Sequence, residues 1–335
     1  MKTALVERAL ALGFAQCRVA AAKPPRYGDA FSDWLADGKH GTMEWLQRGE
    51  EKRLNPALVL PDVKSVVVLT TNYFQGPGHS ARRGRIARYA WGADYHDVIQ
   101  PRLDALDAFL SANGGKQKIY TDTGPVLERD FGAEAGIGWT GKSTMLLNRE
   151  LGTWFFLSVI LTTLEIEPDP PQRNRCGNCT RCIDACPTDA ITAPHRLDAR
   201  KCISYQTIEN KGPIPEEMRP LIGDRIYGCD DCLDACPWNR FAQASREIAF
   251  SAGAATDSAD LRDYISWDDN KFRAAFRASP IKRIKRRGFL RNVCVVLGNI
   301  GTSEDLPALE TAAADPEPLI AEHAAWAIRQ IRSRK

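Results

Sequence analysis

Apolar positions in the first 165 residues alternate between helical and extended spacing. Residues 5–12 and 98–110 carry apolar side chains at helical spacing, and the first of these stretches closes at Gly13. Three other stretches have the β-branched and apolar content of strands: residues 65–71, 117–121 and 153–163. Strands separated by helices indicate an α/β layer domain.

The pattern changes after residue 165. A proline-rich acidic connection at 165–171 leads into a block that holds eight of the ten cysteines. A loose stretch at 251–260 then precedes a segment with helical periodicity only, whose helix candidates are 289–300 and 319–331. We therefore predict an α+β multidomain protein with three parts: an α/β domain at 1–165, a cysteine-rich domain at 166–250 and a helical segment at 251–335.

The composition, with 44% hydrophobic and 26% charged residues, is typical of a soluble globular protein. The longest apolar run, residues 154–161, is too short to span a bilayer. The first residues run into Glu7 and Arg8 and show neither a secretory nor a twin-arginine signal. We therefore expect a cytoplasmic protein without a membrane partner, whose cysteines do not form a disulfide framework.

The cysteine block has the ligand pattern of a bacterial two-cluster ferredoxin. Residues 176–187 read C-x2-C-x2-C-x3-C-P, a run whose fourth cysteine binds the other cluster. A second run, residues 229–237, has Ile226 in place of its first cysteine, and Cys202 is the spare cysteine that most simply replaces it. The predicted ligands are Cys176, Cys179, Cys182 and Cys236 for the first 4Fe–4S cluster, and Cys186, Cys202, Cys229 and Cys232 for the second.

Structural zinc is the alternative for such cysteines. Zinc sites use two separated pairs rather than one dense run, and the proline after each fourth cysteine favours iron–sulfur. Two adjacent clusters carry single electrons, so the chain requires a low-potential electron donor, which the sequence does not identify, and an electron acceptor.

The acceptor is expected in the α/β domain. That domain lacks the glycine-rich patterns that bind dinucleotides or nucleoside triphosphates. Asp94 and His96 resemble the start of a D-x-H-x-x-G cobalamin motif, but Ile99 takes the place of its glycine. A bond between His96 and cobalt is therefore not expected.

Several motifs together resemble the epoxyqueuosine reductase family, over essentially the whole chain. They are KRLNP (52–56), AWGADYH (90–96), TDTG (121–124), AGIG (135–138), GK (141–142), CISY (202–205) and YGCD (227–230), beside the cysteine runs. The resemblance implies an oxidoreductase that uses cobalamin and two 4Fe–4S clusters to reduce epoxyqueuosine to queuosine at the wobble position of tRNA. That reaction takes two electrons and two protons and releases water.

The resemblance also implies individual site residues. Asp122 matches the family's proposed general acid, a role that demands a raised pKa, whereas its ordinary alternative is an Asx turn before Gly124. Matched by position, the cobalamin pocket includes Arg53, Ala87, Asp122, Leu146, Leu157 and Ser204, with Cys229 and Asp230 where the second cluster approaches the corrin.

A basic segment indicates nucleic-acid binding. Between Asp269 and Glu304 the chain has nine lysines and arginines and no acidic residue, whereas an ordinary solvated helix face mixes both signs. The predicted contacts to the phosphates of tRNA carrying epoxyqueuosine are Lys282, Arg283, Lys285, Arg286, Arg287 and Arg291, and a second cluster, Arg82, Arg83, Arg85 and Arg88, extends this surface. The helices that follow resemble one HEAT-type pair, which must pack on the rest of the protein.

Other functions stay open. A reductive dehalogenase uses the same cobalamin and cluster pair, but usually begins with a twin-arginine signal and needs no basic tail. A non-enzymatic ferredoxin-type electron-transfer protein would use the clusters alone and would leave the α/β domain without a cofactor. An RNA-binding scaffold with structural clusters is a third possibility.

Overall fold

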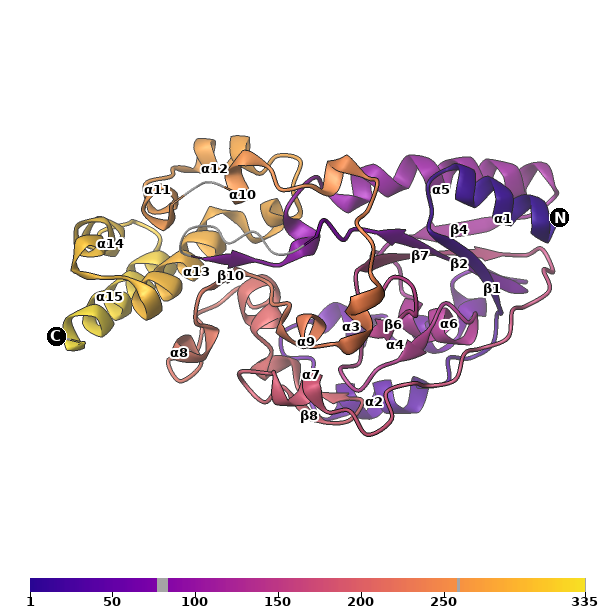
Figure 1. The fold of residues 1–335 in the computed structure, drawn as a ribbon, viewed down its shortest axis with the longest axis horizontal. Helices are drawn as coiled ribbons and strands as arrows, with labels where there is room; N and C mark the ends of the chain where they lie inside the picture. Colours follow the sequence, from indigo (N-terminus) through magenta and orange to yellow (C-terminus); the bar gives the residue numbers. More distant parts are fainter. Residues whose placement is uncertain (77–83, 258–259, 335) are drawn as a thin grey trace.

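The computed structural model describes residues 1–76, 84–257 and 260–334. The two chain ends lie at opposite ends of the long axis, with the N-terminus beside a β-sheet and the C-terminus in a helical unit (Figure 1). Within the described residues, no helix is both long and apolar enough to cross a membrane.

A four-stranded sheet forms the core of the N-terminal part. Its order is β1 (Gln16–Ala21), β2 (Ser65–Asn72), β7 (Phe155–Thr162) and β4 (Gln117–Tyr120), and every pair is antiparallel. Because β2 and β4 both pair with β7, the helix α5 (Tyr95–Ala112) connects two parallel strands that are separated by a third, a split β-α-β unit. The predicted strands are therefore present, but the parallel sheet typical of alternating strands and helices is not, because β7 enters between its two neighbours.

Helices cover both faces of this sheet. On one face, Val67 and Leu69 of β2 belong to the apolar cluster that includes α5 and α1 (Lys2–Ala11). On the other face, Val66 and Val68 pack in a cluster with α6 (Glu128–Glu134). Figure 1 shows α5 and α6 on opposite sides of the sheet. Because both faces are buried, β2 is a continuous apolar run rather than an alternating one.

Short elements complete this part of the chain. They are α2 (Gly28–Ala36), α3 (Glu44–Arg48), α4 (Glu50–Leu54) and the hairpin β5 (Trp139–Thr140) with β6 (Leu146–Leu147).

The cysteine-rich segment is built around two one-turn helices. α7 (Arg181–Asp184) and α9 (Asp231–Asp234) pack against each other, and the hairpin β8 (Ile191–Ala193) with β9 (Arg196–Leu197) lies between them in the sequence. Before α9, β10 (Arg225–Tyr227) pairs in parallel with β3 (Arg85–Ile86), which joins this segment to the N-terminal part.

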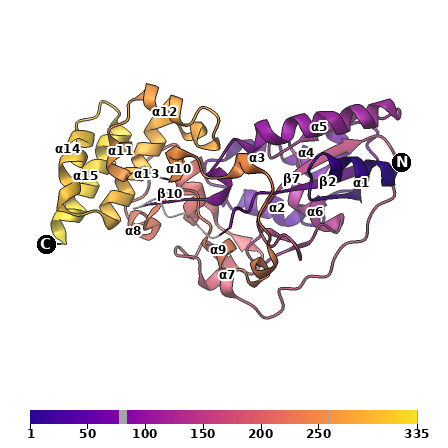
Figure 2. The same cartoon turned by 45° about the horizontal axis from the view of Figure 1, so that its top comes forward.

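The C-terminal unit is helical, as predicted. Its long helices are α13 (Lys285–Ile300) and α15 (Pro318–Ser333), which contain the two predicted helix candidates and pack on each other. The shorter helices are α8 (Arg219–Ile222), α10 (Ala254–Asp257), α11 (Leu261–Ile265), α12 (Asp269–Ala275) and α14 (Leu306–Ala313). Figure 2 shows these helices gathered at one end of the molecule.

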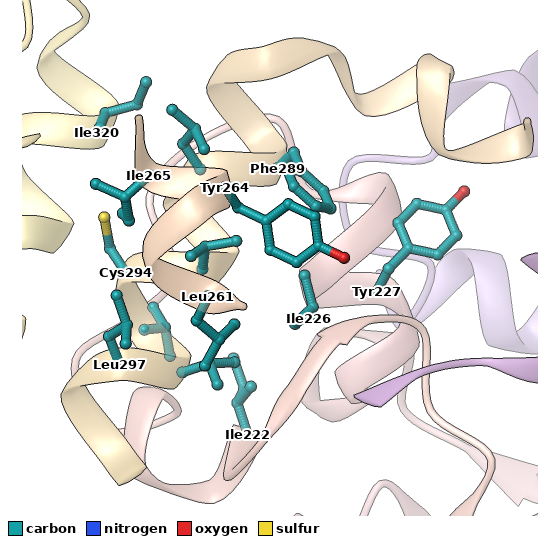
Figure 3. Close-up of a cluster of buried hydrophobic side chains, with 14 of the residues drawn as sticks. Ile222, Ile226, Tyr227, Leu261, Tyr264, Ile265, Phe289, Cys294, Leu297 and Ile320 are labelled. Carbon is teal, nitrogen blue, oxygen red and sulfur yellow. The ribbon is translucent and has the colours of Figure 1, made fainter. Parts of the chain in front are cut away.

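This helical unit shares its core with the cysteine-rich segment. Ile226 and Tyr227 of β10 are fully buried beside Leu261, Tyr264 and Phe289 (Figure 3). The helical pair therefore packs on the rest of the protein, as its length requires. The boundaries at residues 165 and 250 stay a prediction, since one apolar core crosses the second of them.

Candidate functional site

The eight cysteines of the block lie around α7 and α9. In the first run, Cys182 lies within α7 and Cys186 follows it. The second run repeats this arrangement, because Cys229 follows β10, Cys232 lies within α9 and Cys236 comes after it. Since α7 and α9 pack together, the two runs are neighbours in space.

Electrostatic interactions sort these thiols into two groups. Burial raises the pKa of Cys236 to about 11, and the thiols that add to this rise are those of Cys176, Cys182 and Cys179. Burial also raises the pKa of Cys232 well above its ordinary value, and the thiols that contribute are those of Cys229, Cys202 and Cys186. Each group takes members from both runs, and the assignment of these thiols to two clusters stays a prediction.

The donor set suits iron–sulfur clusters chemically. Each group offers four sulfur ligands, which is the number that a 4Fe–4S cluster takes. The sulfur of Cys186 also accepts a hydrogen bond from the backbone N–H of Ala190, with N and Sγ 3.3 Å apart, the kind of bond that tunes cluster potentials.

The missing cysteine of the second run has a structural reason. The Ile226 side chain is fully buried in the core shared with the C-terminal helices (Figure 3). The Ile226 carbonyl accepts a hydrogen bond from Asn292 Nδ2 at 2.8 Å. A cysteine at this position would place its thiol in that apolar core, away from the other ligands. Cys202 instead lies within electrostatic range of Cys186 and follows the 3-10 turn Ala199–Lys201.

Asp122 lies in a strained turn directly after β4. Its φ of +60° falls in the left-handed region, which costs a non-glycine residue on the order of 1–3 kcal/mol and persists only where the surroundings hold it. Here Asp122 Oδ2 accepts a hydrogen bond from the Tyr95 hydroxyl at 2.7 Å, and its backbone N–H donates to Glu128 Oε1 at 2.9 Å. The carboxylate of Asp122 is otherwise exposed to solvent.

Glu128, at the start of α6, is a second carboxyl group in this site that the predicted residues do not include. Burial, and then the nearby Asp122 carboxylate, raise the pKa of Glu128 to about 8. The hydrogen bond from the Asp122 backbone N–H and the charges of Arg129 and Arg53 oppose this rise. Glu128 therefore holds a proton at neutral pH, next to a carboxylate that is open to solvent. Only its position, six residues after Asp122 in the same turn-to-helix segment, could have suggested this role from the sequence.

A row of aromatic rings connects Asp122 with the second cysteine run. The ring of Tyr95 meets the ring of Tyr89 edge-on, with centroids 6.2 Å apart. The centroids of the Tyr89 and Tyr227 rings are 6.0 Å apart. Tyr227 is two residues before Cys229, and its carbonyl accepts a hydrogen bond from the Ala87 N–H at 2.8 Å. The turn that holds Asp122 and the loop that begins the second run thus border one continuous packed layer.

A pocket of about 190 Å³ lies at the end of this row, lined by Ala87, Cys229 and Asp230 among others. Asp230 Oδ2 accepts a hydrogen bond from the Arg88 backbone N–H at 2.8 Å. The buried Nε of Arg88 has no hydrogen-bond partner among the described residues. Cofactor pockets measure roughly 300–1,000 Å³, so this pocket is large enough for only part of a corrin.

Comparison with known proteins identifies the family. A family model described as epoxyqueuosine reductase QueG matches residues 53–123, and one described as a 4Fe-4S double cluster binding domain matches residues 175–239. The epoxyqueuosine reductase of Xanthomonas campestris pv. campestris is 43% identical over 328 residues, which cover 95% of this chain and 92% of that relative. This chain belongs to the epoxyqueuosine reductase family.

Two solved structures of epoxyqueuosine reductases share this fold. One, crystallised with an epoxyqueuosine-modified stem loop of tRNA-Tyr, is 32% identical with a TM-score of 0.91 and covers 98% of this chain and 90% of its own. The second, from Bacillus subtilis, has its catalytic aspartate loop swung out of the active site. It is 31% identical with a TM-score of 0.90 and covers the same shares, 98% and 90%. These likenesses confirm the mixed fold of helices and sheet.

The residues predicted for cobalamin form two groups in this epoxyqueuosine reductase family member. Ala87, Cys229 and Asp230 line the pocket described above. The other group surrounds α6: Arg53, whose charge acts on Glu128, with Asp122, Leu146 and Leu157. Ser204 belongs to neither group. It lies two residues after Cys202, directly before the π-helical turn Tyr205–Glu209. The pocket itself contains none of the second group.

Four of the six predicted tRNA contacts are exposed. Lys282, Arg283 and Arg287 pair with Asp94, Glu209 and Glu317 across 3.0, 2.9 and 3.5 Å. These three cations are 43–48% exposed, although their carboxylate partners are buried or half-buried, so their outer faces can contact phosphates. Lys285 is exposed at a φ of +58°. Burial lowers the pKa of Arg283, whereas Glu209, the tyrosines at 227 and 89 and, most weakly, Asp122 raise it, so Asp122 lies within electrostatic range of this cation.

Arg291 contradicts the prediction. Its side chain is only 1% exposed, and its guanidinium donates to the carbonyls of Gln206, Asn210 and Gly212. A cation enclosed in this way cannot reach a phosphate. Arg286 is also largely structural, since it bonds Asp315 and the carbonyl of Trp267.

The second basic cluster does not extend the basic segment either. Arg85 pairs with Asp224 and Asp231, and Arg88 pairs with Asp230 and Asp234, all beside the second cysteine run. These arginines therefore pair with half-buried and exposed aspartates near that run. Arg82 and Arg83 lie outside the described residues.

We predict that Cys202→Ala removes one cluster and spares the other. The chain purified without oxygen is expected to hold about eight irons in two clusters, and the variant about four, because the group that includes Cys186 loses one sulfur ligand. Iron analysis with electron paramagnetic resonance measures this. Cys17→Ala, which removes a buried cysteine outside the block, serves as the control. Full iron in the Cys202 variant would show that this residue is not a ligand.

We predict that Glu128 makes the stability of the native state depend on pH. Its pKa is about 8 in the native state against 4.5 ordinarily, so between these values the native chain holds a proton that the unfolded chain releases. Stability due to this group therefore falls as pH rises through that window. Glu128→Gln cannot ionise, so its Tm relative to wild type is expected to be higher at pH 9 than at pH 6.

Calorimetry at both pH values checks this expectation. In an Asp122→Asn background the pH effect of Glu128→Gln is expected to shrink, because one cause of the raised pKa is gone. An identical Tm difference at pH 6 and pH 9 would contradict a protonated Glu128.

Proposed function

We propose that this chain reduces epoxyqueuosine to queuosine at the wobble position of tRNA. The observation that carries the proposal is its 43% identity to a named epoxyqueuosine reductase over 95% of the chain. In this reaction both carbon–oxygen bonds of the epoxide break, a carbon–carbon double bond forms, and the oxygen leaves as water after two electrons and two protons are added. These relatives favour neither reductive dehalogenation nor a purely electron-carrying role.

The eight cysteines are proposed to bind two 4Fe–4S clusters, with the ligand sets predicted from the spacing. Cobalamin is proposed as the second cofactor, held between the pocket at Ala87, Cys229 and Asp230 and the group around α6. When bound, it supplies a strongly reducing metal centre for the epoxide. A site that joins the two residue groups suits a cofactor much larger than the 190 Å³ pocket.

Asp122 is proposed to donate the proton to the departing oxygen. An unprotonated oxide is a poor leaving group, so a positioned acid lowers the barrier. The neutral Glu128 carboxyl group behind the Asp122 turn can hold a proton for it, and the Tyr95 hydroxyl orients its carboxylate. The Bacillus subtilis structure has its catalytic aspartate loop outside the active site. By analogy, the bonds from Tyr95 and to Glu128 are proposed to hold the Asp122 turn in place.

The tRNA is proposed to bind over the exposed part of the basic segment. Lys282, Arg283, Lys285 and Arg287 present positive charge there, and Arg283 lies within electrostatic range of Asp122. Contacts to phosphates position an RNA without reading its sequence. A bound stem loop would therefore have its backbone beside the proposed catalytic turn. A tRNA substrate also points to the cytoplasm as the place of action.

We predict that Asp122→Asn cannot replace the wild-type chain. Bacterial cells that lack their own epoxyqueuosine reductase are expected to accumulate epoxyqueuosine in tRNA, and this chain to restore queuosine. The Asn variant keeps the shape but loses the acid, so its turnover is expected to fall by about 10²–10⁴. Mass spectrometry of tRNA nucleosides and single-turnover assays measure the two effects.

Cobalamin binding and iron content are expected to be unchanged in this variant. If wild-type chain fails to restore queuosine, the proposed function is wrong. If the Asn variant matches the wild-type rate in single turnover, Asp122 is only a turn residue.

We predict that the basic segment binds tRNA through phosphates. Reversing Lys282, Arg283 and Arg287 to Glu is expected to raise KM for tRNA and to reduce the slope of log affinity against log salt by roughly 2–3, about 0.7–0.9 for each lost contact. The matched control reverses Arg8, Lys64 and Lys116, three exposed cations at the N-terminal end. An unchanged salt slope in the first variant would remove this surface from the tRNA site.

A further inference from the structure

Positive charge surrounds the first group of cysteines without acidic partners. Residues 170–183 contain Arg173, Arg175 and Arg181 and no acidic residue, and all three arginines are exposed. Asn174 Nδ2 donates to the carbonyl of Thr140 at 3.1 Å, which places this stretch beside Lys142. These four side chains, Lys142, Arg173, Arg175 and Arg181, are called the cationic rim below.

The cationic rim differs from the other basic regions of the molecule. Lys282, Arg283 and Arg287 each have a carboxylate partner, as do Arg85 and Arg88 beside the second run. Within residues 1–76, 84–257 and 260–334, none of the four rim side chains forms a salt bridge. The nearest acid along α7, Asp184, instead accepts a hydrogen bond from the Thr180 hydroxyl at 2.8 Å.

The rim opens on the first cluster's cysteines. A small cavity of about 60 Å³ is lined by the four thiols of the first group, by Cys232 of the second group, and by Lys142, Arg175 and Trp238, and no acidic residue lines it. By contrast, the pocket at the second run has Asp230, Asp231 and Asp234 in its wall beside its arginines. Of these two cavities, the one at the first group of cysteines is therefore the one whose charged lining residues all have the same sign.

Burial also distinguishes the two groups of cysteines. Around Cys176 and Cys179 the neighbouring residues are exposed, from Arg173 to Arg175 and at Gly177 and Asn178. Cys202 instead precedes the buried Ile203, and Cys229 follows the buried pair Tyr227 and Gly228. α7, which contains Cys182 of the first run, lies near the lower margin of the molecule in Figure 2. Electrons from outside would therefore enter at the first cluster.

We propose that the cationic rim docks a small acidic protein that carries single electrons. The inference rests on the proposed function, since it names the partner that feeds the clusters. In the step itself one electron leaves the reduced carrier and enters the first 4Fe–4S cluster, so the carrier is oxidised by one electron, the cluster is reduced by one, and no bond forms or breaks. The rim's charge steers an acidic partner toward that cluster.

The test uses a strongly acidic flavodoxin in its fully reduced form as the probe. The variant Arg175→Glu/Arg181→Glu is compared with Arg8→Glu/Lys116→Glu, which changes the net charge equally at the far end of the molecule. Stopped-flow absorbance follows reduction of the clusters without tRNA or cobalamin. Isothermal titration calorimetry measures the Kd of each variant for oxidised flavodoxin, and this binding measurement does not depend on turnover.

The rim variant is expected to lose about 10-fold or more in the second-order rate constant at low ionic strength, and its rate is expected to depend less on salt. Its Kd is expected to rise, while the control variant behaves like wild type. Reduced methyl viologen, a small cation, is expected to reduce the clusters of both variants at least as fast as those of wild type. A rim variant with full iron that binds and oxidises flavodoxin like wild type would overturn the proposal.

Two further measurements keep the result interpretable. If Arg175→Glu/Arg181→Glu loses iron, Arg173→Glu, which is farther from a ligand, replaces it under the same criteria. Turnover of epoxyqueuosine tRNA with methyl viologen as reductant tests the proposed function separately. Failure of that turnover in wild type would contradict the function, whereas normal turnover with no effect of the rim variants on flavodoxin would contradict only the docking surface.

Discussion

Burial of β10 between two parts of the protein is the constraint on which the rest depends. On one side this strand pairs with β3 of the N-terminal part, and on the other Ile226 and Tyr227 fill the core of the C-terminal helices. Asn292 reinforces the contact through hydrogen bonds to the carbonyls of Thr207 and Ile226, each at 2.8 Å. Because Cys229 and Asp230 directly follow β10, this packing decides where the second cysteine run meets the pocket at Ala87.

The proposed catalytic turn depends on the same packed layer. Tyr95 bonds Asp122 and continues through Tyr89 to Tyr227, so one set of rings supports both the acid and the second cysteine run. On the outer side, Lys282 pairs with Asp94, which caps α5 immediately before Tyr95. A tRNA bound to the basic segment would therefore lie within two or three side chains of the carboxylate proposed to complete the chemistry.

Charge is arranged differently at the two ends of the proposed electron path. At the inner end, arginines and aspartates neutralise each other around the second run, in pairs that range from half-buried to exposed. At the outer end, the three arginines of the cationic rim are exposed, and none of its four cations forms a salt bridge with another described residue. Paired charges cancel each other's field at a distance, whereas charges of one sign act over distance on a partner, and this contrast distinguishes the proposed cofactor site from the proposed docking surface for an electron carrier.

Local patterns were sufficient for part of this description. Ligand spacing in the cysteine runs, the apolar periodicity of α13 and α15, and the motifs of the family are all readable along the chain, because each depends on neighbours within a few residues. The replacement of the first cysteine by Ile226 was equally visible, although its cause, the shared helical core, was not.

Tertiary structure decided the features that depend on burial. Arg291 and Lys285 are both cations of the same basic segment. The Arg291 side chain is enclosed by backbone carbonyls, whereas Lys285 is exposed. The antiparallel sheet arises because β7 inserts between β2 and β4, a long-range pairing that periodicity does not encode. The raised pKa of Glu128 also depends on tertiary structure. Its pKa is set by desolvation and by the Asp122 carboxylate, and both exist only once α6 has packed against the turn after β4.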